Sequence, residues 1–390
     1  MPLAMGTAPW VAAAAMTAAW WRGRPKTPTP SLSKQTAADP AHLEATEPGR
    51  GRLAASPRRI PAAGWKDVLW RTLREVTHDR LTVVAGSVTF YTLLAIFPAL
   101  GVFVSLYGLI ADVSTVRGQL EQLAYVFPAP VLEIVGDQMM RLATTRPASL
   151  SVAFIFSLML SLWSANASMK SLFDGLNIAY DEVEKRNFFT LNALTYGFTL
   201  ALLVFLIVVT AVLVGAPIWL EGLGLWTGWL IPARWLALWL VASSAFTVVY
   251  RYGPCRRPAR WRWVNMGGAV AAALWLPGSL AFSWYLNNIA HFDVTYGSLG
   301  AVIGFMMWIW FSVMVVLIGA ELNAEIEHQT AVDSTVGAPK PMGQRGAAMA
   351  DTVGLRFVGF RKGAGMLWGD TRRQMGNLVK RKPPSAPPRA

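Results

Sequence analysis

Long apolar stretches, separated by shorter polar connections, run through most of the chain. Six of them carry almost no charge and reach about 20 residues or more, which is enough to cross a bilayer core of about 30 Å. They cover residues 83–111, 149–168, 190–216, 229–250, 266–290 and 298–320. Soluble core helices do not repeat at this length. The pattern therefore predicts an all-α, polytopic membrane protein with six transmembrane helices rather than a large soluble protein.

An amphipathic helix is predicted just before the first span. Apolar residues recur there at helical spacing, on one face: Trp65, Val68, Leu69, Leu73 and Val76. Such a helix lies in the membrane surface or packs against the ends of the spans, and both interpretations stay open. Two short helices are also predicted on the outer surface, near residues 116–124 and 131–139.

Composition supports the membrane interpretation. Hydrophobic residues make up 54% of the chain and charged residues 15%, against a usual charged share of about 25%. The 18 tryptophans suit membrane interfaces. Cys255 is the only cysteine, so neither an intrachain disulfide nor a cysteine metal cluster can form.

The positive charges follow a topology pattern. With the amino-terminal tail in the cytoplasm, the connections 169–189 and 251–265 are cytoplasmic and carry Lys and Arg, whereas 217–228 and 291–297 carry neither. The positive-inside rule then puts both basic tails in the cytoplasm. The net charge of +13 is thus mainly a topology signal, with attraction to anionic lipid second and nucleic-acid binding the weaker explanation.

The two ends of the chain differ from its middle. Residues 22–61 contain seven prolines among Ser, Thr and Ala. We expect residues 1–61 to be a disordered extension, 62–328 a six-span membrane domain and 329–390 a basic, disordered cytoplasmic tail. Within the extension, the alanine-rich residues 1–21 form a poor secretory signal. A seventh span or a misassigned start codon are the alternatives there.

Polar groups inside the predicted spans are mild. No predicted span holds Asp, Glu or Lys near its middle, which argues against a proton-coupled pump. Hydroxyl and amide groups such as that of Tyr91 ordinarily make helix–helix hydrogen bonds. Pro98 is expected to kink or end the first span, and Gly300 and Gly304 form a GxxxG packing site on the last.

The segment 163–189 turns from apolar to polar without losing its helical rhythm. Apolar residues recur at helical intervals as Leu172, Phe173, Leu176 and Tyr180. The second span is therefore predicted to continue as a helix beyond the membrane, where polar groups cost nothing. A cytoplasmic elbow before the third span would then comprise Asn177, Tyr180, Glu184 and Arg186, with charges that pair with each other or with phosphate headgroups.

Four short motifs occur in order along this frame. They are Phe90-Tyr-Thr-Leu-Leu-Ala-Ile-Phe-Pro98, Leu176-Asn-Ile-Ala-Tyr180 with Glu184 and Arg186, Val294-Thr-Tyr-Gly-Ser-Leu-Gly300, and Gly319-Ala-Glu-Leu-Asn323. Together they resemble the YihY/BrkB family of membrane proteins over residues 62–328. The resemblance implies an integral inner (plasma) membrane protein of six helices with both termini cytoplasmic. Members have carried a ribonuclease BN label, regarded as a misassignment, and a virulence-factor label, and envelope-lipid transport has been proposed for some.

Enzyme chemistry finds no support in the sequence. A zinc-dependent ribonuclease needs clustered His and Asp ligands to activate water. The four histidines are scattered, at His42, His78, His291 and His328, and neither a GxSxG elbow nor a Walker-type sequence is present. We therefore expect no catalytic residue, no bound metal and no cofactor.

The favoured function is transport or flipping of a lipid or an amphipathic envelope component. A non-transporting membrane scaffold, or envelope-integrity protein, is the alternative, and a ribonuclease comes third. The expected partners are membrane lipids, without specific nucleic-acid binding, and the oligomeric state stays open.

Candidate residues fall into two sets. Those for substrate binding are Tyr91, Asn177, Tyr180, Glu184, Arg186, Tyr296 and Glu321. Those for backbone geometry are Pro98, Gly297, Gly300, Gly304 and Gly319. For Glu184 and Arg186 an internal salt bridge is an equal alternative, and Glu321 is expected near a partner such as Arg186 or Arg251.

Overall fold

The chain folds into long helices. The computed structural model describes residues 34–35, 40–107, 152–210, 230–290 and 299–357, together with Gly136, Phe292 and Tyr296. Its long helices are α3 (Ala62–His78), α4 (Leu81–Tyr107), α7 (Val152–Ala179), α8 (Phe188–Thr210), α10 (Leu230–Tyr252), α11 (Trp261–Asn288) and α13 (Gly300–Glu327). The shorter elements are β1 (Lys34–Gln35), α2 (Pro40–Thr46), the 3-10 helix η1 (Pro57–Arg59), α14 (Ala348–Asp351) and β2 (Val353–Gly354). The predicted helical class is confirmed.

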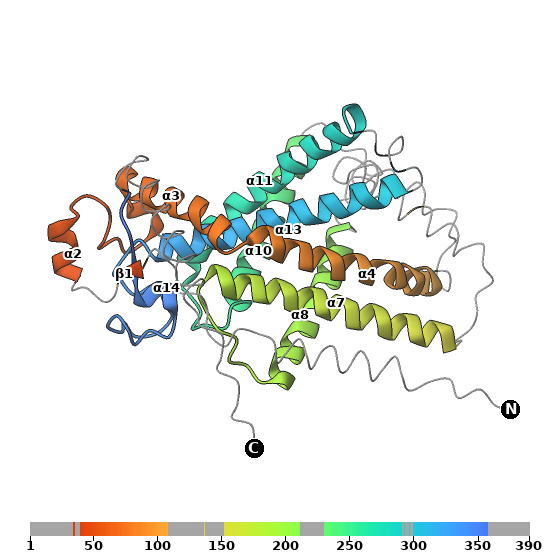
Figure 1. Ribbon diagram of the computed structural model, residues 1–390, viewed down its shortest axis with the longest axis horizontal. Helices are drawn as coiled ribbons and strands as arrows, with labels where there is room; N and C mark the ends of the chain where they lie inside the picture. Colours follow the sequence, from red (N-terminus) through yellow and green to blue (C-terminus); the bar gives the residue numbers. More distant parts are fainter. Residues whose placement is uncertain are drawn as a thin grey trace, which may run out of the picture.

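Helix α13 is the central element of the bundle. It packs against α3, α4, α7 and α11, while α4 runs along α7 and α10 along α11 (Figure 1). Gly267 and Gly319 bring α11 and α13 together backbone to backbone, because a Cβ at Gly267 would lie 2.3 Å from the Gly319 carbonyl oxygen. The Asn323 Oδ1 accepts a hydrogen bond from the Gly267 N–H at 2.7 Å. Close approach at small residues is typical of helix packing in membranes.

The bundle is apolar on both its inner and its outer surfaces. Its core contains fully buried Phe173, Leu176 and Leu317. Large apolar residues also face outward, such as Phe156 and Trp284, which are 50% and 60% exposed. A helix that is hydrophobic all round belongs in a large core or in lipid, and outward-facing aromatic residues favour lipid.

Two helices in the described part of the chain have the length and composition of a membrane span. They are Trp261–Leu286 and Gly300–Glu327. The pair Ala62–His78 and Leu81–Ile96 would make a third if it forms a single span bent by 60°. Spanning character is therefore evident for two or three helices of this part of the chain, and not for all six predicted spans.

Two helices extend past the ends of the predicted spans. Helix α7 continues to Ala179, in agreement with the helical rhythm of the sequence. Helix α13 continues to Glu327, past the predicted end at residue 320. This extension carries Glu321 and Glu325, which are both fully buried.

Helix α3 is amphipathic, but it buries a largely polar face. The buried positions are Gly64, Asp67, Val68, Arg71, Thr72 and Glu75. Of the residues assigned to its apolar face, Val68 is fully buried, whereas Leu69 and Leu73 are 53% and 74% exposed. The buried charges Asp67 and Arg71 are paired with Arg50 and with Glu325 of α13. Packing against a span end, one of the two alternatives, is what α3 does.

Two segments that flank the bundle in sequence, residues 40–61 and 329–357, join beside α3 and α13 to form what we call the polar cap (left in Figure 1). Arg52, fully buried, donates hydrogen bonds to Glu47, to the Gln329 carbonyl at 3.2 Å and to the Gly354 carbonyl at 2.8 Å. β1 and β2 pair antiparallel, Lys34 opposite Gly354. The expectation of disorder is therefore wrong for these parts of the two tails, because buried arginines supply partners for their backbone.

Some predicted features lie outside the described residues. These are residues 1–21, the helix near 116–124, the helix near 131–139 apart from Gly136, and Gly297. Pro98 lies within α4, which continues to Tyr107 and so does not end there. Gly300 and Gly304 are buried in the first turns of α13.

Candidate functional site

The ends of α3, α7 and α13 and the start of α4 meet beneath the polar cap. Two tight turns bring their charged residues together. Arg80, between α3 and α4, and Asp181, just after α7, adopt the left-handed backbone conformation with φ of 51° and 53°. This conformation is uncommon outside glycine, and at Arg80 it accompanies a bend of 60° between α3 and α4. Asp79 and Asp181 belong to these turns, and both carboxylates act electrostatically on Glu321 of α13.

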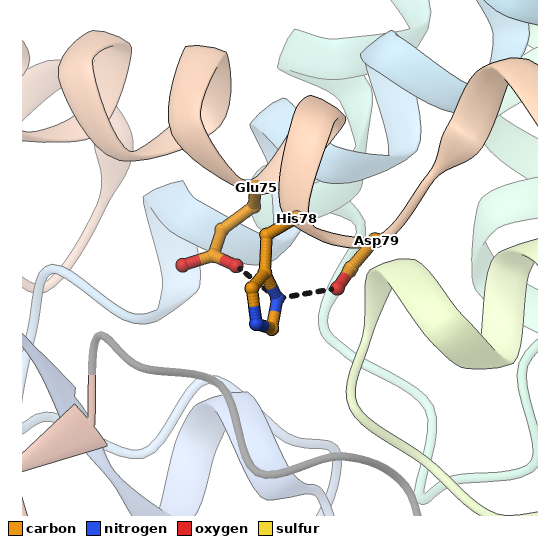
Figure 2. Close-up of side chains that lie close together, drawn as sticks. All are labelled: Glu75, His78 and Asp79. Carbon is orange, nitrogen blue, oxygen red and sulfur yellow. Dashed lines mark hydrogen bonds and ion pairs between the residues drawn. The ribbon is translucent and has the colours of Figure 1, made fainter. Parts of the chain in front are cut away.

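His78 lies between two carboxylates (Figure 2). Its Nδ1 is 3.1 Å from Asp79 Oδ1 and 3.3 Å from Glu75 Oε2. Hydrogen bonds to Asp79 and Glu75 raise the pKa of His78 to about 10, so the imidazole is protonated at neutral pH. Burial raises the pKa of Asp79 to about 6, although the hydrogen bond from His78 opposes the change. Both groups precede α4 and lie outside the apolar helices.

Glu321 is a buried acidic group for which the described residues supply neither a hydrogen bond nor an ion pair. Its side chain is fully buried, and neither carboxylate oxygen has a hydrogen-bond partner among the described residues. The charges that act on it most strongly are those of Asp79, Glu325, Glu75 and Asp181, in that order. We call the four acidic residues Glu75, Asp79, Asp181 and Glu321 the carboxylate cluster, because the first three all act electrostatically on Glu321.

Neighbouring acidic groups on α13 are paired in the usual way. Glu325 forms an ion pair with Arg71 of α3, whose guanidinium also donates to Gln329 Oε1 at 2.8 Å. Glu327 accepts two hydrogen bonds from Arg256, at 2.7 and 3.0 Å, and a third from Ser334. Buried charges normally require such partners. Glu321 departs from this rule, which makes the carboxylate cluster the candidate functional site.

The predicted elbow forms, and its polar groups bond to one another. Glu184 accepts hydrogen bonds from Arg186 Nε and NH2, both at 2.7 Å, and from Asn177 Nδ2 at 3.0 Å. Asn177 Oδ1 accepts from the Cys255 N–H at 2.7 Å. Burial raises the pKa of Glu184, but the hydrogen bonds and charge of Arg186 outweigh it, so the pKa is lowered. The internal salt bridge, one of the two alternatives for this pair, is present.

The remaining predicted binding residues lie in different surroundings. Tyr180 is fully buried, with the Arg256 guanidinium 4.1 Å from its ring centre. Tyr91 packs edge-on against Phe90, with ring centres 5.3 Å apart. Tyr296 is 50% exposed. No contact recorded for the described residues joins Tyr91 or Tyr296 to the carboxylate cluster.

The partners considered for Glu321 are engaged elsewhere. Arg186 pairs with Glu184. Arg251 donates to the Ala259 carbonyl and lies 4.3 Å from the ring centre of Trp261.

Sequence reasoning missed Glu75, His78, Asp79 and Asp181 as site residues. Glu75 lies outside the apolar positions of the predicted amphipathic helix, and nothing near it in the sequence indicates a site. The spacing of Glu321 and Glu325, four residues apart on one face of α13, was the available signal. It pointed to a shared acidic surface only once the helix was known to extend past residue 320. Among the described residues, Glu75, His78 and Asp79 could hold a metal ion, because their ligand atoms lie within 4.8 Å of one another.

Comparison with known proteins gives a family. The family model described as Virulence factor BrkB matches residues 72–343. The ribonuclease-like protein YfkH of Bacillus subtilis is 28% identical over 252 residues, which cover 62% of this chain and 88% of that protein. A UPF0761 membrane protein of Aggregatibacter aphrophilus is 25% identical, covering 67% of this chain and 92% of its own length. Another, from Alkalilimnicola ehrlichii, is 28% identical and covers 70% of this chain and 62% of its own length. No solved structure matches.

Proposed function

Because this chain belongs to the Virulence factor BrkB family and is a membrane protein, we propose that it moves a lipid or an amphipathic envelope component across the bilayer. The observation that carries this proposal is Glu321, fully buried and without a hydrogen-bond partner among the described residues. Burying an ionisable group without a hydrogen-bond partner costs on the order of several kcal/mol of folding free energy. In membrane helices such groups commonly mark substrate or ion pathways.

The backbone around Glu321 supports a conformational change in which α13 moves relative to its neighbouring helices. The chain bends by 60° between α3 and α4, and Arg80 and Asp181 adopt left-handed conformations on either side of the cluster. Binding of a cationic or hydrogen-bonding substrate group at Glu321 would alter the balance of charge between α13 and these turns. We expect this change to shift α13 against α3 and α7, since small helix shifts are a common form of switching in packed helices.

The proposed membrane setting is a six-span bundle in the inner membrane with both termini cytoplasmic. Its support is the arginine-rich connection at Arg256 and Arg257 together with the exposed Leu69 and Leu73 on α3, which suit a helix at a membrane surface. Reporter fusions after residue 257 and after residue 390 test it. We expect cytoplasmic reporter activity for both, and an external reporter at either position would refute the topology.

A vesicle assay tests transport. The purified full-length protein is reconstituted into liposomes with a panel of fluorescent lipids, zwitterionic and anionic, with one and with two acyl chains. Movement is followed by quenching of the outer-leaflet label. We expect protein-dependent movement of at least one lipid, and a loss of about 10-fold or more in Glu321→Gln. His42→Gln, at an exposed position on α2, is the control. The absence of protein-dependent movement across the panel would refute the proposal.

The second candidate is a non-transporting scaffold, and the polar cap favours it. Arg71 of α3 donates to the Leu355 carbonyl, Arg52 joins the two cap segments by donating to the Gly354 carbonyl, and Arg345 donates to the Ala331 carbonyl within the second segment. These bonds suit a rigid platform for a partner. The two functions differ in what Glu321 does. A scaffold predicts that Glu321→Gln complements a null mutant as fully as the wild-type protein, whereas a carrier predicts that it does not.

A further inference from the structure

The connection between α10 and α11, residues 253–260, carries two arginines without an acidic partner in the part of the chain that the structure describes. The Arg257 guanidinium has neither a hydrogen bond nor an ion pair there, and its Nη1 is buried. Arg260 donates from Nη2 to the Gly337 carbonyl at 3.1 Å and forms no ion pair with a described residue. Arginine stays charged at physiological pH, so two positive charges are left without a counter-charge.

Both guanidinium groups lie against the same residue, Gly337. A Cβ at this position would be 2.5 Å from Arg257 Nη2, and the Gly337 carbonyl oxygen accepts the hydrogen bond from Arg260. Gly337 also has a φ of +95°, a conformation that other residues rarely adopt. These contacts bring the two positive charges together, and a side chain at residue 337 would displace the Arg257 guanidinium.

The backbone beneath the two arginines is fixed by the second segment of the polar cap. The Arg257 N–H donates to the Gly346 carbonyl and the Arg260 N–H donates to the Ser334 carbonyl, both at 2.9 Å. A rigid pair of guanidinium groups suits phosphate, because each presents parallel N–H donors in the geometry of the phosphate oxygens.

Acidic side chains in the adjoining segments are bonded to other groups. Glu327 forms its ion pair with Arg256. Asp333 accepts hydrogen bonds from the N–H groups of Thr335 and Lys340, both at 2.9 Å. An anion from outside the chain is therefore the natural counter-charge for the two arginines.

The two arginines lie where a helix with the character of a membrane span begins. Arg260 is the N-cap of α11, whose residues Trp261–Leu286 have the length and composition of a span. Trp261 and Tyr252 flank the connection, are exposed, and have ring centres 6.2 Å apart. Exposed Trp and Tyr are typical of the headgroup level of a bilayer. The phosphate groups of lipids lie at this level, which favours a lipid over free phosphate as the source of the anion.

We propose that Arg257 and Arg260, held against Gly337, bind the phosphate group of an anionic lipid. Two unpaired positive charges match a phosphate monoester, which carries about 1.5 to 2 negative charges at neutral pH, better than a diester with one charge. The site includes no residue of the carboxylate cluster, and it stands whether or not the protein moves a lipid.

Lipid binding to the purified full-length protein tests the site. The protein in a neutral detergent is titrated with phosphatidic acid, phosphatidylglycerol and phosphatidylcholine, and bound lipid is counted by native mass spectrometry. We expect one phosphatidic acid per chain, bound about 10-fold or more tighter than phosphatidylcholine. Arg257→Gln and Arg260→Gln should each weaken its binding by about 10-fold or more. Arg262→Gln removes the same charge from an exposed position of α11 and should leave binding unchanged.

A pair of glycine variants separates local geometry from net charge. Gly337→Ala keeps every charge but displaces the Arg257 guanidinium, so phosphatidic acid should bind about 10-fold more weakly. Gly343→Ala is the matched control, since Gly343 has a similar φ of +86° and no atom within 4 Å of the added Cβ. It should bind phosphatidic acid like the wild type.

Several results would overturn the site. Phosphatidylcholine bound as tightly as phosphatidic acid, unchanged binding in Gly337→Ala, or equal weakening in Arg262→Gln would each do so. Inorganic phosphate bound as tightly as the lipid would overturn the assignment to a lipid. Glu321→Gln, which should slow lipid movement, should leave phosphatidic acid binding unchanged, so this site and the proposed transport fail in different assays.

Discussion

Replacing Arg256 with methionine should strongly destabilise the polar end of the bundle. The Arg256 guanidinium is fully buried and bonded to both oxygens of Glu327, at 2.7 and 3.0 Å. The central carbon of the guanidinium lies 4.1 Å from the ring centre of Tyr180. Methionine fills much of the same volume but carries no charge, so the change removes the ion pair while sparing most of the packing.

The magnitude follows from what remains behind. Without Arg256, the buried Glu327 carboxylate keeps one described hydrogen bond, from Ser334 Oγ at 2.7 Å. Removing one partner of a buried pair costs about 3–5 kcal/mol, because the other charge is left uncompensated. In a chain of this size a loss of that order lowers the melting temperature by on the order of 10 °C.

The assay is thermal unfolding in detergent, followed by the fluorescence of the tryptophans. Arg58→Met, at an exposed position of η1, is the matched control and should stay within about 0.5 kcal/mol of the wild type. The double variant Arg256→Met with Glu327→Met should recover most of the loss, since apolar replacement of a whole buried pair is often neutral. The reasoning is refuted if the single variant melts like the wild type, or if the double variant is no more stable than the single one.

Three further predictions concern other parts of the molecule. Because the pKa of Glu184 is lowered, its pairing with Arg186 stabilises the fold at pH values above the usual carboxyl pKa, and this stabilisation is lost as the pH falls through the lowered pKa. The difference in melting temperature between the wild type and Glu184→Gln should therefore shrink from about pH 7 to about pH 3. A difference that stays constant over this range would contradict the prediction. Gly319→Ala should cost about 1–3 kcal/mol, because the new Cβ would lie 2.5 Å from the Tyr250 hydroxyl; Gly197→Ala, with no atom within 4 Å, is the control and should be neutral or slightly stabilising by chemical or thermal unfolding. Ending the chain after residue 328 removes the two carbonyl acceptors of Arg52 and should lower the melting temperature, whereas ending it after residue 357 keeps every described contact and should not.

The helices could be predicted because apolar length is a local property. The continuation of α7 to Ala179 was equally local, since the apolar repeat persists past Trp163. The elbow followed for the same reason, as Asn177, Glu184 and Arg186 lie within ten residues of one another. The elbow also bonds to the connection after α10, through the Cys255 N–H and the Gly253 carbonyl. That contact joins distant parts of the chain and could not be predicted from the sequence.

The polar cap and the carboxylate cluster could not be predicted, because both depend on contacts between distant parts of the chain. A proline-rich segment with several charges ordinarily lacks the apolar area to fold. Here the buried Arg52 donates hydrogen bonds to carbonyl groups that lie hundreds of residues away in the sequence, and it forms an ion pair with Glu47. Likewise, Glu75 appears as a solvent-facing residue of an amphipathic helix until α3 is placed on α13.

The hydrogen bonds of the buried Arg52 also determine the order in which parts of the protein can fold during synthesis. Its two carbonyl acceptors lie 277 and 302 residues further along the chain. At about 5–20 residues per second, roughly 15–60 s pass between the emergence of Arg52 and that of Gly354. During that time Arg52 lacks both carbonyl acceptors, so the segment that contains Glu47 and Arg52 remains accessible to chaperones and proteases while the helices enter the membrane. The polar cap can therefore form only after residue 354 has been synthesised. If the ribosome stalls before that residue, the amino-terminal segment of the nascent chain remains exposed, because Arg52 lacks the Gly354 carbonyl.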